Sequence, residues 1–277
     1  MISTTVLSMD TSFEGAGPRN RPKVFRASGT RRMAGVVLLL VVWEVLSVTG
    51  VLSPQTLAGP GSVLSTGRHL IADGELSSNL WVSLHRVFWG LVLGVSVGVG
   101  LALFSGLSHL GEAVVDGPMQ IFRSLPILAL QPLFIVWFGI GEEMKYVLIA
   151  FAVAFPVYIN TYAGIRGVDQ RYVELAHGVR LSRWQLIRRV VLPGALPNFL
   201  VGLRFSLAVA WLVLILSEEI NATSGIGYLI TQAGLSGETN VIVVCLAVYG
   251  ILGLLSDLFV RVLEKRALAW RKGLDLA

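Results

Sequence analysis

Residues Tyr172–Pro197 read YVELAHGVRLSRWQLIRRVVLPGALP, a polar, arginine-rich island between two long apolar runs. Apolar side chains recur in it at helical spacing, which predicts two short helices joined by a bend. Ser182 and Gln185 have the spacing of a capping box at the start of the second helix. Pro193 and Pro197 predict the end of the regular pattern, because proline lacks an N–H and clashes one turn back. A helical hairpin of this kind that protrudes from a membrane domain can be bound by a partner protein.

The apolar runs on both sides of this island indicate an integral membrane protein. Of the 277 residues, 54% are hydrophobic and 14% are charged, and the mean hydropathy is +0.73. Such a chain is too apolar for an ordinary soluble domain, so we predict an all-α membrane fold. Six apolar stretches are each near the length that crosses a bilayer, at roughly 34–51, 87–106, 121–141, 146–165, 199–217 and 241–260.

The positions of Lys and Arg predict how these six spans are oriented. Of the 22 cationic residues, six lie in the N-terminal tail, six between spans four and five, and five at the C-terminal end. The loop 218–240 contains none. Cationic residues favour cytoplasmic segments, so we expect both termini in the cytoplasm and the loop 218–240 outside.

The chain is expected to have three parts. Residues 1–32 have the composition of a disordered basic cytoplasmic tail, residues 33–265 of a transmembrane domain, and residues 266–277 of a cytoplasmic C-terminal tail. No small-residue cleavage site follows the first apolar run, which indicates an uncleaved span. Residues 52–85 are interpreted as an external connector that ends in a helix leading into span two.

Span two carries a stripe of small residues, Gly90, Gly94 and Gly98, at four-residue spacing. Small residues on one stripe allow two helices to approach closely in lipid. We expect the stripe to be a packing surface, either within the subunit or against another one. Glu44 lies deeper in its span than the other charged residues, so it needs a partner or a polar cleft.

Prolines and polar groups in the later spans suit a translocation path, because proline frees backbone carbonyls that must be satisfied or line a cavity. The alternative for each proline is a kink settled by packing alone. Residues 217–229, SEEINATSGIGYL, are expected to start an external helix that closes the outer end of the path. The candidate path residues are Arg123, Pro126, Asn160, Arg204, Glu218, Ser224, Gly225 and Gly227.

Several kinds of chemistry are disfavoured by the sequence. Paired carboxylates can form a glycosidase or metal centre, but Glu218 and Glu219 are adjacent and point about 100° apart on a helix, with no histidine nearby. Cys245 is the only cysteine, which excludes an intramolecular disulfide. No G-x-x-x-x-G-K-[ST] phosphate loop is present, so we expect no ATP cofactor in this chain. No H-E-x-x-H motif and no serine nucleophile elbow is present, which argues against a protease or hydrolase, so we expect no enzyme activity. The charges alternate with spans, which argues against nucleic-acid binding.

The arginine-rich loop resembles the EAA loop of ABC-importer permeases. The resemblance is carried by Glu174-Leu175-Ala176, Ser182, Leu192-Pro193 and Ala195-Leu196-Pro197. It implies that the loop, at about 170–197, is a coupling helix held in a groove of a cytoplasmic ATPase. The alternative is an amphipathic interfacial helix that binds anionic lipid. The coupling contacts implied by the resemblance are Glu174, Leu175, Ala176, Gly178, Arg180, Ser182, Arg183 and Trp184.

One position departs from the family pattern. Where the family has glycine four residues after the second alanine of the motif, this chain has Arg180. Glycine tolerates a positive φ, and Gly178 lies two residues earlier. We expect Gly178 to form the bend and Arg180 to extend the first helix. The other outcome is that Arg180 keeps the bend at a cost in backbone strain.

The wider resemblance covers most of residues 34–270. The stretches PLFIVWFGIG, FPVYINTYAGIR and VGLRFSLAVAWL resemble the nitrate, taurine and aliphatic-sulfonate branch, and most closely its aliphatic-sulfonate members. This implies a six-span type I ABC-importer transmembrane domain in a bacterial inner membrane. The implied partners are a second permease copy in a homodimer, two cytoplasmic ATPase subunits that hold ATP and Mg²⁺, and an external solute-binding protein. Taurine, nitrate or another small solute remains possible as the substrate.

A secondary transporter or channel driven by an ion gradient is the alternative function. It requires ionisable residues near the middle of the membrane, and Glu44 in the first span is the single candidate. No internal repeat is present in the sequence, so a two-fold path needs two copies or a homologous partner.

Overall fold

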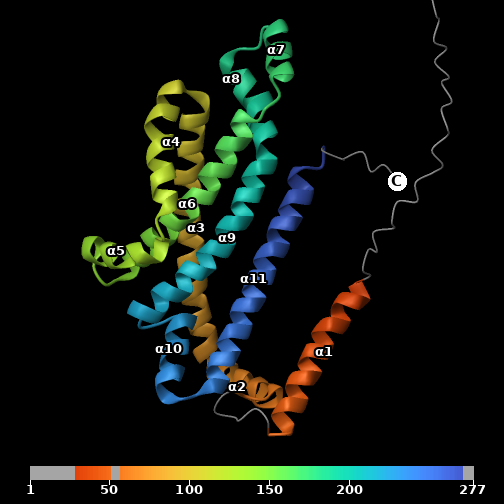
Figure 1. The fold of residues 1–277 in the computed structure, drawn as a ribbon, viewed down its shortest axis with the longest axis vertical. Coiled ribbons are helices and arrows are strands. Elements are labelled where there is room, and N and C mark those ends of the chain that lie inside the picture. Colours follow the sequence, from red (N-terminus) through yellow and green to blue (C-terminus); the bar gives the residue numbers. More distant parts are fainter. Residues whose placement is uncertain (1–28, 51–56, 271–277) are drawn as a thin grey trace, which may run out of the picture. The chain divides into compact units, whose positions relative to one another are not determined.

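The computed structural model describes residues 29–50 and 57–270, and every regular element within them is a helix. The chain divides into two units, residues 1–42 and 43–277, with the boundary inside α1 (Gly29–Val48). The second unit contains, in chain order, α2 (Pro60–Ala72), α3 (Glu75–Leu107), α4 (His109–Ser124), the 3₁₀ helix η1 (Ile127–Leu130), α5 (Gln131–Phe138), α6 (Glu142–Arg166), α7 (Gln170–Gly178), α8 (Arg183–Leu186), the π-helix η2 (Ile187–Val191), α9 (Leu192–Asn221), α10 (Ile226–Ser236) and α11 (Thr239–Ala267) (Figure 1).

The predicted tails fall largely outside the described residues. Nothing is described for residues 1–28 and 271–277, so both tails stay predictions there. α1 begins at Gly29, inside the region predicted as tail. α11 extends to Ala267, just beyond the predicted end of the transmembrane domain.

Four helices of the described part are long and apolar enough to cross a membrane individually. They are α3, α6, α9 and α11, and they confirm predicted spans two, four, five and six. The apolar part of α1, Val37–Val48, is shorter. α3 has 33 residues and a length of about 50 Å, against a hydrocarbon core of roughly 30 Å. Its first turns therefore supply the helix predicted at the end of the connector.

The helix α2 was not predicted. It lies in the part of the connector that precedes the predicted helix, and Pro60 lies in its first turn. Proline is well tolerated there, because the first N–H groups of a helix have no partner in any case.

Predicted span three is not one continuous helix. α4 and the helical segment Ile127–Phe138 meet at 95°. Leu125, at the break, has an extended conformation with φ −83° and ψ 133°. The residue before a proline is disfavoured in the helical region, so Pro126 forces the turn. The proline kink expected in this stretch is therefore a sharp break between two helices.

The prolines after the coupling loop do not end the helix, contrary to prediction. An uninterrupted helical segment runs from Arg183 to Ile220, 38 residues long, through α8, η2 and α9. Pro193 falls in the first turn of α9, directly after the π-turn of η2. A π-turn widens the helix locally, which relieves the clash of a proline ring with the preceding turn.

α6 is the central helix of the second unit. In its most apolar window 61% of the residues are buried, against 17% for α11. The glycine stripe of α3 packs directly against it. A Cβ added to Gly94 would lie 2.5 Å from the carbonyl oxygen of Ala150, and one added to Gly98 would lie 2.7 Å from that of Ala154. The stripe therefore packs within the subunit, which resolves the two alternatives left open by the sequence.

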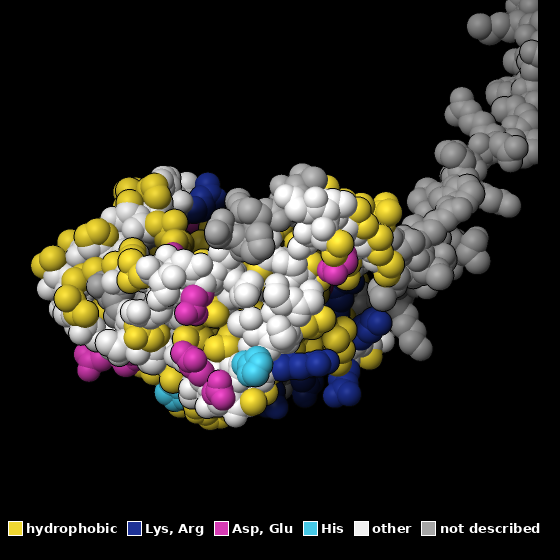
Figure 2. Space-filling view, turned by 90° about the horizontal axis from the view of Figure 1, so that it is seen from below, with side chains coloured by type: hydrophobic (Ala, Val, Ile, Leu, Met, Phe, Trp, Pro, Cys, Tyr) yellow, Lys and Arg dark blue, Asp and Glu magenta, His cyan; other side chains and the backbone are white. Residues whose placement is uncertain are grey.

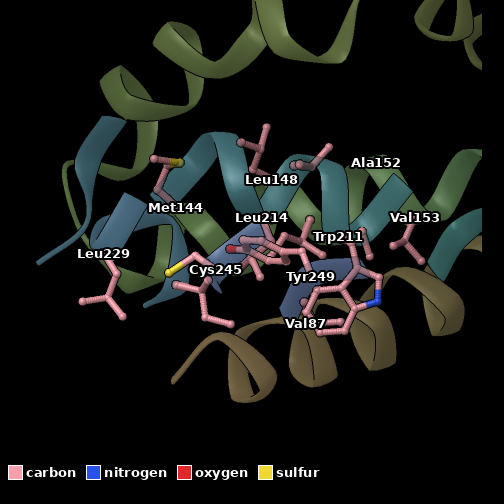
Figure 3. Close-up of a cluster of buried hydrophobic side chains, with 14 of the residues drawn as sticks. Val87, Met144, Leu148, Ala152, Val153, Trp211, Leu214, Leu229, Cys245 and Tyr249 are labelled. Atoms are coloured by element: carbon pink, nitrogen blue, oxygen red, sulfur yellow. The ribbon is translucent and has the colours of Figure 1, made fainter. Parts of the chain in front are cut away.

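A cluster of buried apolar side chains fills the space where α3, α6, α9, α10 and α11 meet (Figure 3). Met144 and Leu148 of α6 face Leu214 of α9, and Tyr249 and Cys245 reach in from α11. Between helices that are themselves in lipid, such packing stabilises chiefly through van der Waals contact rather than through release of water. The cluster holds α10 and the start of α3 together, which positions the polar groups described next.

Candidate functional site

Residues 169–191 form the hairpin for which the resemblance implies contact with an ATPase. We call it the coupling hairpin, and it begins with α7. The Asp169 side chain accepts a hydrogen bond from the backbone N–H of Arg171 and caps this helix. At its end, the Leu181 N–H donates to the Ala176 carbonyl at 3.0 Å, and the Arg180 N–H donates to the His177 carbonyl at 3.0 Å. These two bonds form a Schellman motif.

Arg180 occupies the left-handed position of that motif, with φ +56°. Gly178 is the last residue of α7 and is absent from the positive-φ positions. The expectation that Gly178 forms the bend was therefore wrong. The hydrogen bonds of the Schellman motif specify which residue turns, and they select the position where the family has glycine.

The second half of the hairpin follows the sequence prediction. Ser182 accepts from the Gln185 N–H at 3.3 Å, and the Gln185 side chain accepts from the Ser182 N–H at 2.9 Å, so the capping box is formed. Leu175 and Trp184 are 66% and 67% exposed. These two large apolar side chains are available to a partner.

The other predicted coupling residues divide between surface and interior. Glu174, Gly178, Arg180, Ser182 and Arg183 are exposed. Ala176 is only 3% exposed and packs inside the hairpin. Its side chain is buried, so its assignment as an ATPase contact stays a prediction.

A buried ion cluster lies at the end of the unit opposite to the hairpin. Arg86 is 1% exposed and forms a bidentate pair with Glu142, with N–O distances of 2.6 and 2.5 Å. Its Nη1 also donates to Glu218 Oε1 at 2.7 Å and to the Ser224 carbonyl at 2.7 Å. One guanidinium therefore joins α3, α6, α9 and the loop before α10.

The carboxylate of Glu218 is fully enclosed. It accepts from Ser83 Oγ at 2.8 Å and from the Gly227 N–H at 2.9 Å, and the Tyr249 hydroxyl lies 3.3 Å away. Gly225 passes so close that a Cβ there would lie 2.5 Å from the carboxylate, and its φ is +114°. Only glycine fits this position.

The cluster corrects the interpretation of Glu218, Ser224, Gly225 and Gly227 as path residues. Glu218 is 0% exposed, so in this conformation these groups form a closed junction rather than the wall of a path. The prediction that Glu218 and Glu219 diverge is confirmed, since Glu218 is buried and Glu219 is half-buried.

Arg86 and Glu142 were missed by the sequence reasoning. Each stands at the edge of a predicted span and could be assigned to a loop. An available signal was the unpaired charge of Glu218, which requires a distant cation if it is buried.

Arg204 forms an ion pair between two of the long helices. Its Nε donates to Asp257 Oδ1 at 2.6 Å, and Asp257 Oδ2 accepts from Arg261 at 2.7 Å. The structure pairs Arg204 of α9 with Asp257 of α11, and its assignment as a path residue stays a prediction.

Arg123 and Asn160 are the two predicted path residues that the structure brings together. Both line a pocket of about 330 Å³ between α4, α6 and α9. Pro126 stands at the bend beside it. The remaining wall is almost entirely apolar, and we call this cavity the Arg123 pocket; its lining residues are Phe122, Arg123, Ile127, Ala152, Phe155, Pro156, Ile159, Asn160, Phe205 and Val209.

Comparison with known proteins gives consistent results. A family model described as binding-protein-dependent transport system inner membrane component matches residues 90–268. The chain is 37% identical over 274 residues to the putative aliphatic sulfonates transport permease protein SsuC of Bacillus subtilis, covering 96% of this chain and 99% of that protein. It is 43% identical over 238 residues to the protein of the same name from Escherichia coli, covering 86% of this chain and 90% of that protein.

Similarity to a solved structure supports the fold. A crystal structure of an amino acid ABC transporter with histidines superposes with a TM-score of 0.59 at 19% identity, covering 72% of this chain and 97% of that chain.

Proposed function

The chain belongs to the family of binding-protein-dependent transport system inner membrane components, and from that premise we propose that it forms the path for aliphatic sulfonates in an ATP-driven importer. The resemblance seen in the sequence is thereby confirmed at the level of the family. The chain is a multi-pass membrane permease and not an enzyme. Membership implies an ATPase and a solute-binding protein as partners.

The substrate proposal is carried by one observation. Two relatives that cover 96% and 86% of this chain are both named for aliphatic sulfonates. Taurine, nitrate or another small solute is the alternative within the family. No comparison favours the ion-gradient alternative, and Glu44, its single candidate residue, is exposed.

The proposed orientation has both termini and the coupling hairpin in the cytoplasm. Five arginines of the hairpin are exposed, in agreement with the preference of cationic residues for that side. The opposite end carries the α2–α3 and α10–α11 connections. Figure 2 shows Asp and Glu side chains on this side, together with some Lys and Arg side chains. Residues 218–240 contain no Lys or Arg, which supports placing the α10 end outside.

The proposed assembly contains two copies of this chain, each coupled to one ATPase through its hairpin. α8, η2 and α9 form one helical segment of 38 residues, about 57 Å long. It joins the hairpin at one end to Glu218 of the buried ion cluster at the other. A displacement of the hairpin by the ATPase would therefore move α9 as a lever, which fits a rigid-body switch. ATP and Mg²⁺ belong to the ATPase subunits.

Transport by a reconstituted importer tests the proposal. We expect ATP-dependent accumulation of pentane-1-sulfonate in vesicles that contain this permease, its ATPase and its binding protein. Leu175→Asp should abolish the ATP-driven step, because Leu175 is an exposed apolar residue on the hairpin. Leu235→Asp is the matched control, since Leu235 is 80% exposed on α10. Accumulation driven by an ion gradient without ATP would overturn the proposed function.

A further inference from the structure

One cation of the predicted spans has no carboxylate partner within the described part of the chain. Five cations lie within or at the edges of predicted spans two to five: Arg86, Arg123, Lys145, Arg166 and Arg204. Four of them are paired with carboxylates: Arg166 with Glu112, and Arg86, Lys145 and Arg204 at N–O distances of 2.5, 2.9 and 2.6 Å. Among the described residues, Arg123 forms no ion pair within the 4.0 Å limit.

Arg123 is exposed on the described chain, at the bend that follows α4, and has no carboxylate there to offset its charge. Arg123 lies in the last turn of α4, where the C-terminal carbonyls offset part of its charge. They do not replace a carboxylate, because a helix end carries only about half an elementary charge. The guanidinium therefore retains the capacity to bind an anion through two parallel N–H donors.

The surroundings of Arg123 are apolar and aromatic. Phe122 and Phe155 stand with ring centroids 6.5 Å apart, and Phe155 is held in turn by Phe151 at 4.8 Å. Phe205 contributes a further wall from α9. The pocket volume of about 330 Å³ is at the lower end of the range for small-molecule sites, roughly 300–1,000 Å³.

A second polar donor reaches the same pocket. Asn160 donates one amide hydrogen to the Pro156 carbonyl at 2.8 Å. An asparagine amide has two such hydrogens, so the other is available to a ligand. The pocket thus combines one cation and one neutral donor with an aromatic wall.

We propose that the Arg123 pocket binds the solute during its passage, and that it takes an anion bearing a short alkyl chain. This inference rests on the proposed function and specifies its substrate class. The anionic head, a sulfonate in the proposed importer, is held by Arg123 and Asn160, and the chain lies against Phe122 and Phe205. Nitrate has no chain to bury there. The ammonium group of taurine would lose its hydration against the phenyl rings without a carboxylate to replace it.

Direct binding to the permease–ATPase complex, with the solute-binding protein omitted, tests the inference. We expect pentane-1-sulfonate to bind more tightly than propane-1-sulfonate, by about fourfold per methylene group. Arg123→Gln should weaken binding at least about tenfold, through loss of a charged hydrogen-bond donor. Arg68→Gln removes the same charge from an exposed position on α2 and should change binding less than about twofold.

Two further variants separate binding from folding. Arg123→Lys keeps the positive charge but loses the two parallel N–H donors of the guanidinium. Its affinity for pentane-1-sulfonate should therefore lie between those of the wild type and Arg123→Gln. Phe205→Ala should flatten the dependence on chain length; Phe205 is 59% exposed, so its truncation leaves the core intact. Buried Cys245 should stay unreactive toward maleimide in every variant that is folded.

The outcomes distinguish the inference from the proposed function. If the wild type imports pentane-1-sulfonate while Arg123→Gln and Phe205→Ala bind and import it normally, the pocket assignment is overturned and the proposed function stands. Equal binding of propane- and pentane-1-sulfonate would likewise overturn the assignment. If the wild-type importer takes up no sulfonate at all, both the pocket assignment and the proposed function are overturned.

Discussion

The backbone conformation at the bend of the coupling hairpin predicts whether substitutions there stabilise or destabilise the hairpin. Arg180 is at φ +56° in the Schellman motif, and Gly178 lies at the end of α7 with nothing within 4 Å of an added Cβ. We predict that Arg180→Gly and Gly178→Ala each stabilise the hairpin. A bend at Gly178 would instead make Gly178→Ala destabilising.

The magnitudes follow from backbone conformation. A non-glycine residue in the left-handed region costs roughly 1–2 kcal/mol, and the greater freedom of an unfolded glycine offsets roughly 0.5–1 kcal/mol of that. The net gain for Arg180→Gly is about 1 kcal/mol in the free energy of local opening. Gly178→Ala gains about 0.5 kcal/mol, because alanine is the better helix former but the position is in the last turn.

Amide hydrogen exchange of the full chain in detergent measures this local opening directly. The reporters are the N–H groups of Arg180 and Leu181, which donate to α7 carbonyls. A gain of about 1 kcal/mol slows their exchange about fivefold, since about 1.4 kcal/mol corresponds to tenfold. In Arg180→Gly the Leu181 amide is the one to follow. Gly100→Ala, with nothing within 4 Å of its Cβ on α3, is the control and should leave the hairpin unchanged.

The result that refutes this reasoning is faster exchange in Gly178→Ala. Faster exchange in Arg180→Gly would also contradict it, because the arginine side chain would then stabilise the bend by more than its backbone strain.

Three further expectations concern the packing, the buried ion cluster and the topology. Gly94→Val should lower the free energy of unfolding by about 2 kcal/mol through overpacking, measured as a lower temperature at which the buried thiol of Cys245 reacts. Gly100→Val is the control and should leave that temperature unchanged. Equal shifts of the reaction temperature in the two variants would contradict the packing argument. Arg86→Met should destabilise by about 3–5 kcal/mol in the same assay, because it leaves a carboxylate buried without its cation; an unchanged transition would show the pair to be dispensable. A reporter fused after Gly237 should be external, and a cytoplasmic signal there would contradict the proposed orientation.

Local features of the hairpin were predicted well from sequence where the responsible groups are close in the chain. The capping box of Ser182 and Gln185 involves groups three residues apart, and it is formed as predicted. The position of the bend was not predicted, although Gly178 and Arg180 are also neighbours. The choice between them depends on which carbonyls of α7 accept the last two N–H groups. A residue's tolerance of positive φ does not specify where the chain must use it.

The prolines give a second example of what local sequence does not predict. Pro126 breaks predicted span three at 95°, whereas the helical segment containing Pro193 and Pro197 continues unbroken for 38 residues. The sequence shows that each proline removes a hydrogen bond. Whether the helix breaks or continues depends on what surrounds it, here an extended residue in one case and a π-turn in the other.

The sequence by itself determined the membrane class, four of the long helices, the presence of the hairpin and the resemblance to importer permeases. Each of these depends on composition, periodicity or a short motif. Only the tertiary structure decided that Arg86 meets Glu218, 132 residues away, and that the glycine stripe faces α6. It also decided that Arg204 pairs with a carboxylate while Arg123 has none among residues 29–50 and 57–270. The physical reason is that the pairing of a buried charge is a long-range property: the residue type specifies that a partner is needed, and only the packing of the helices determines which one it is.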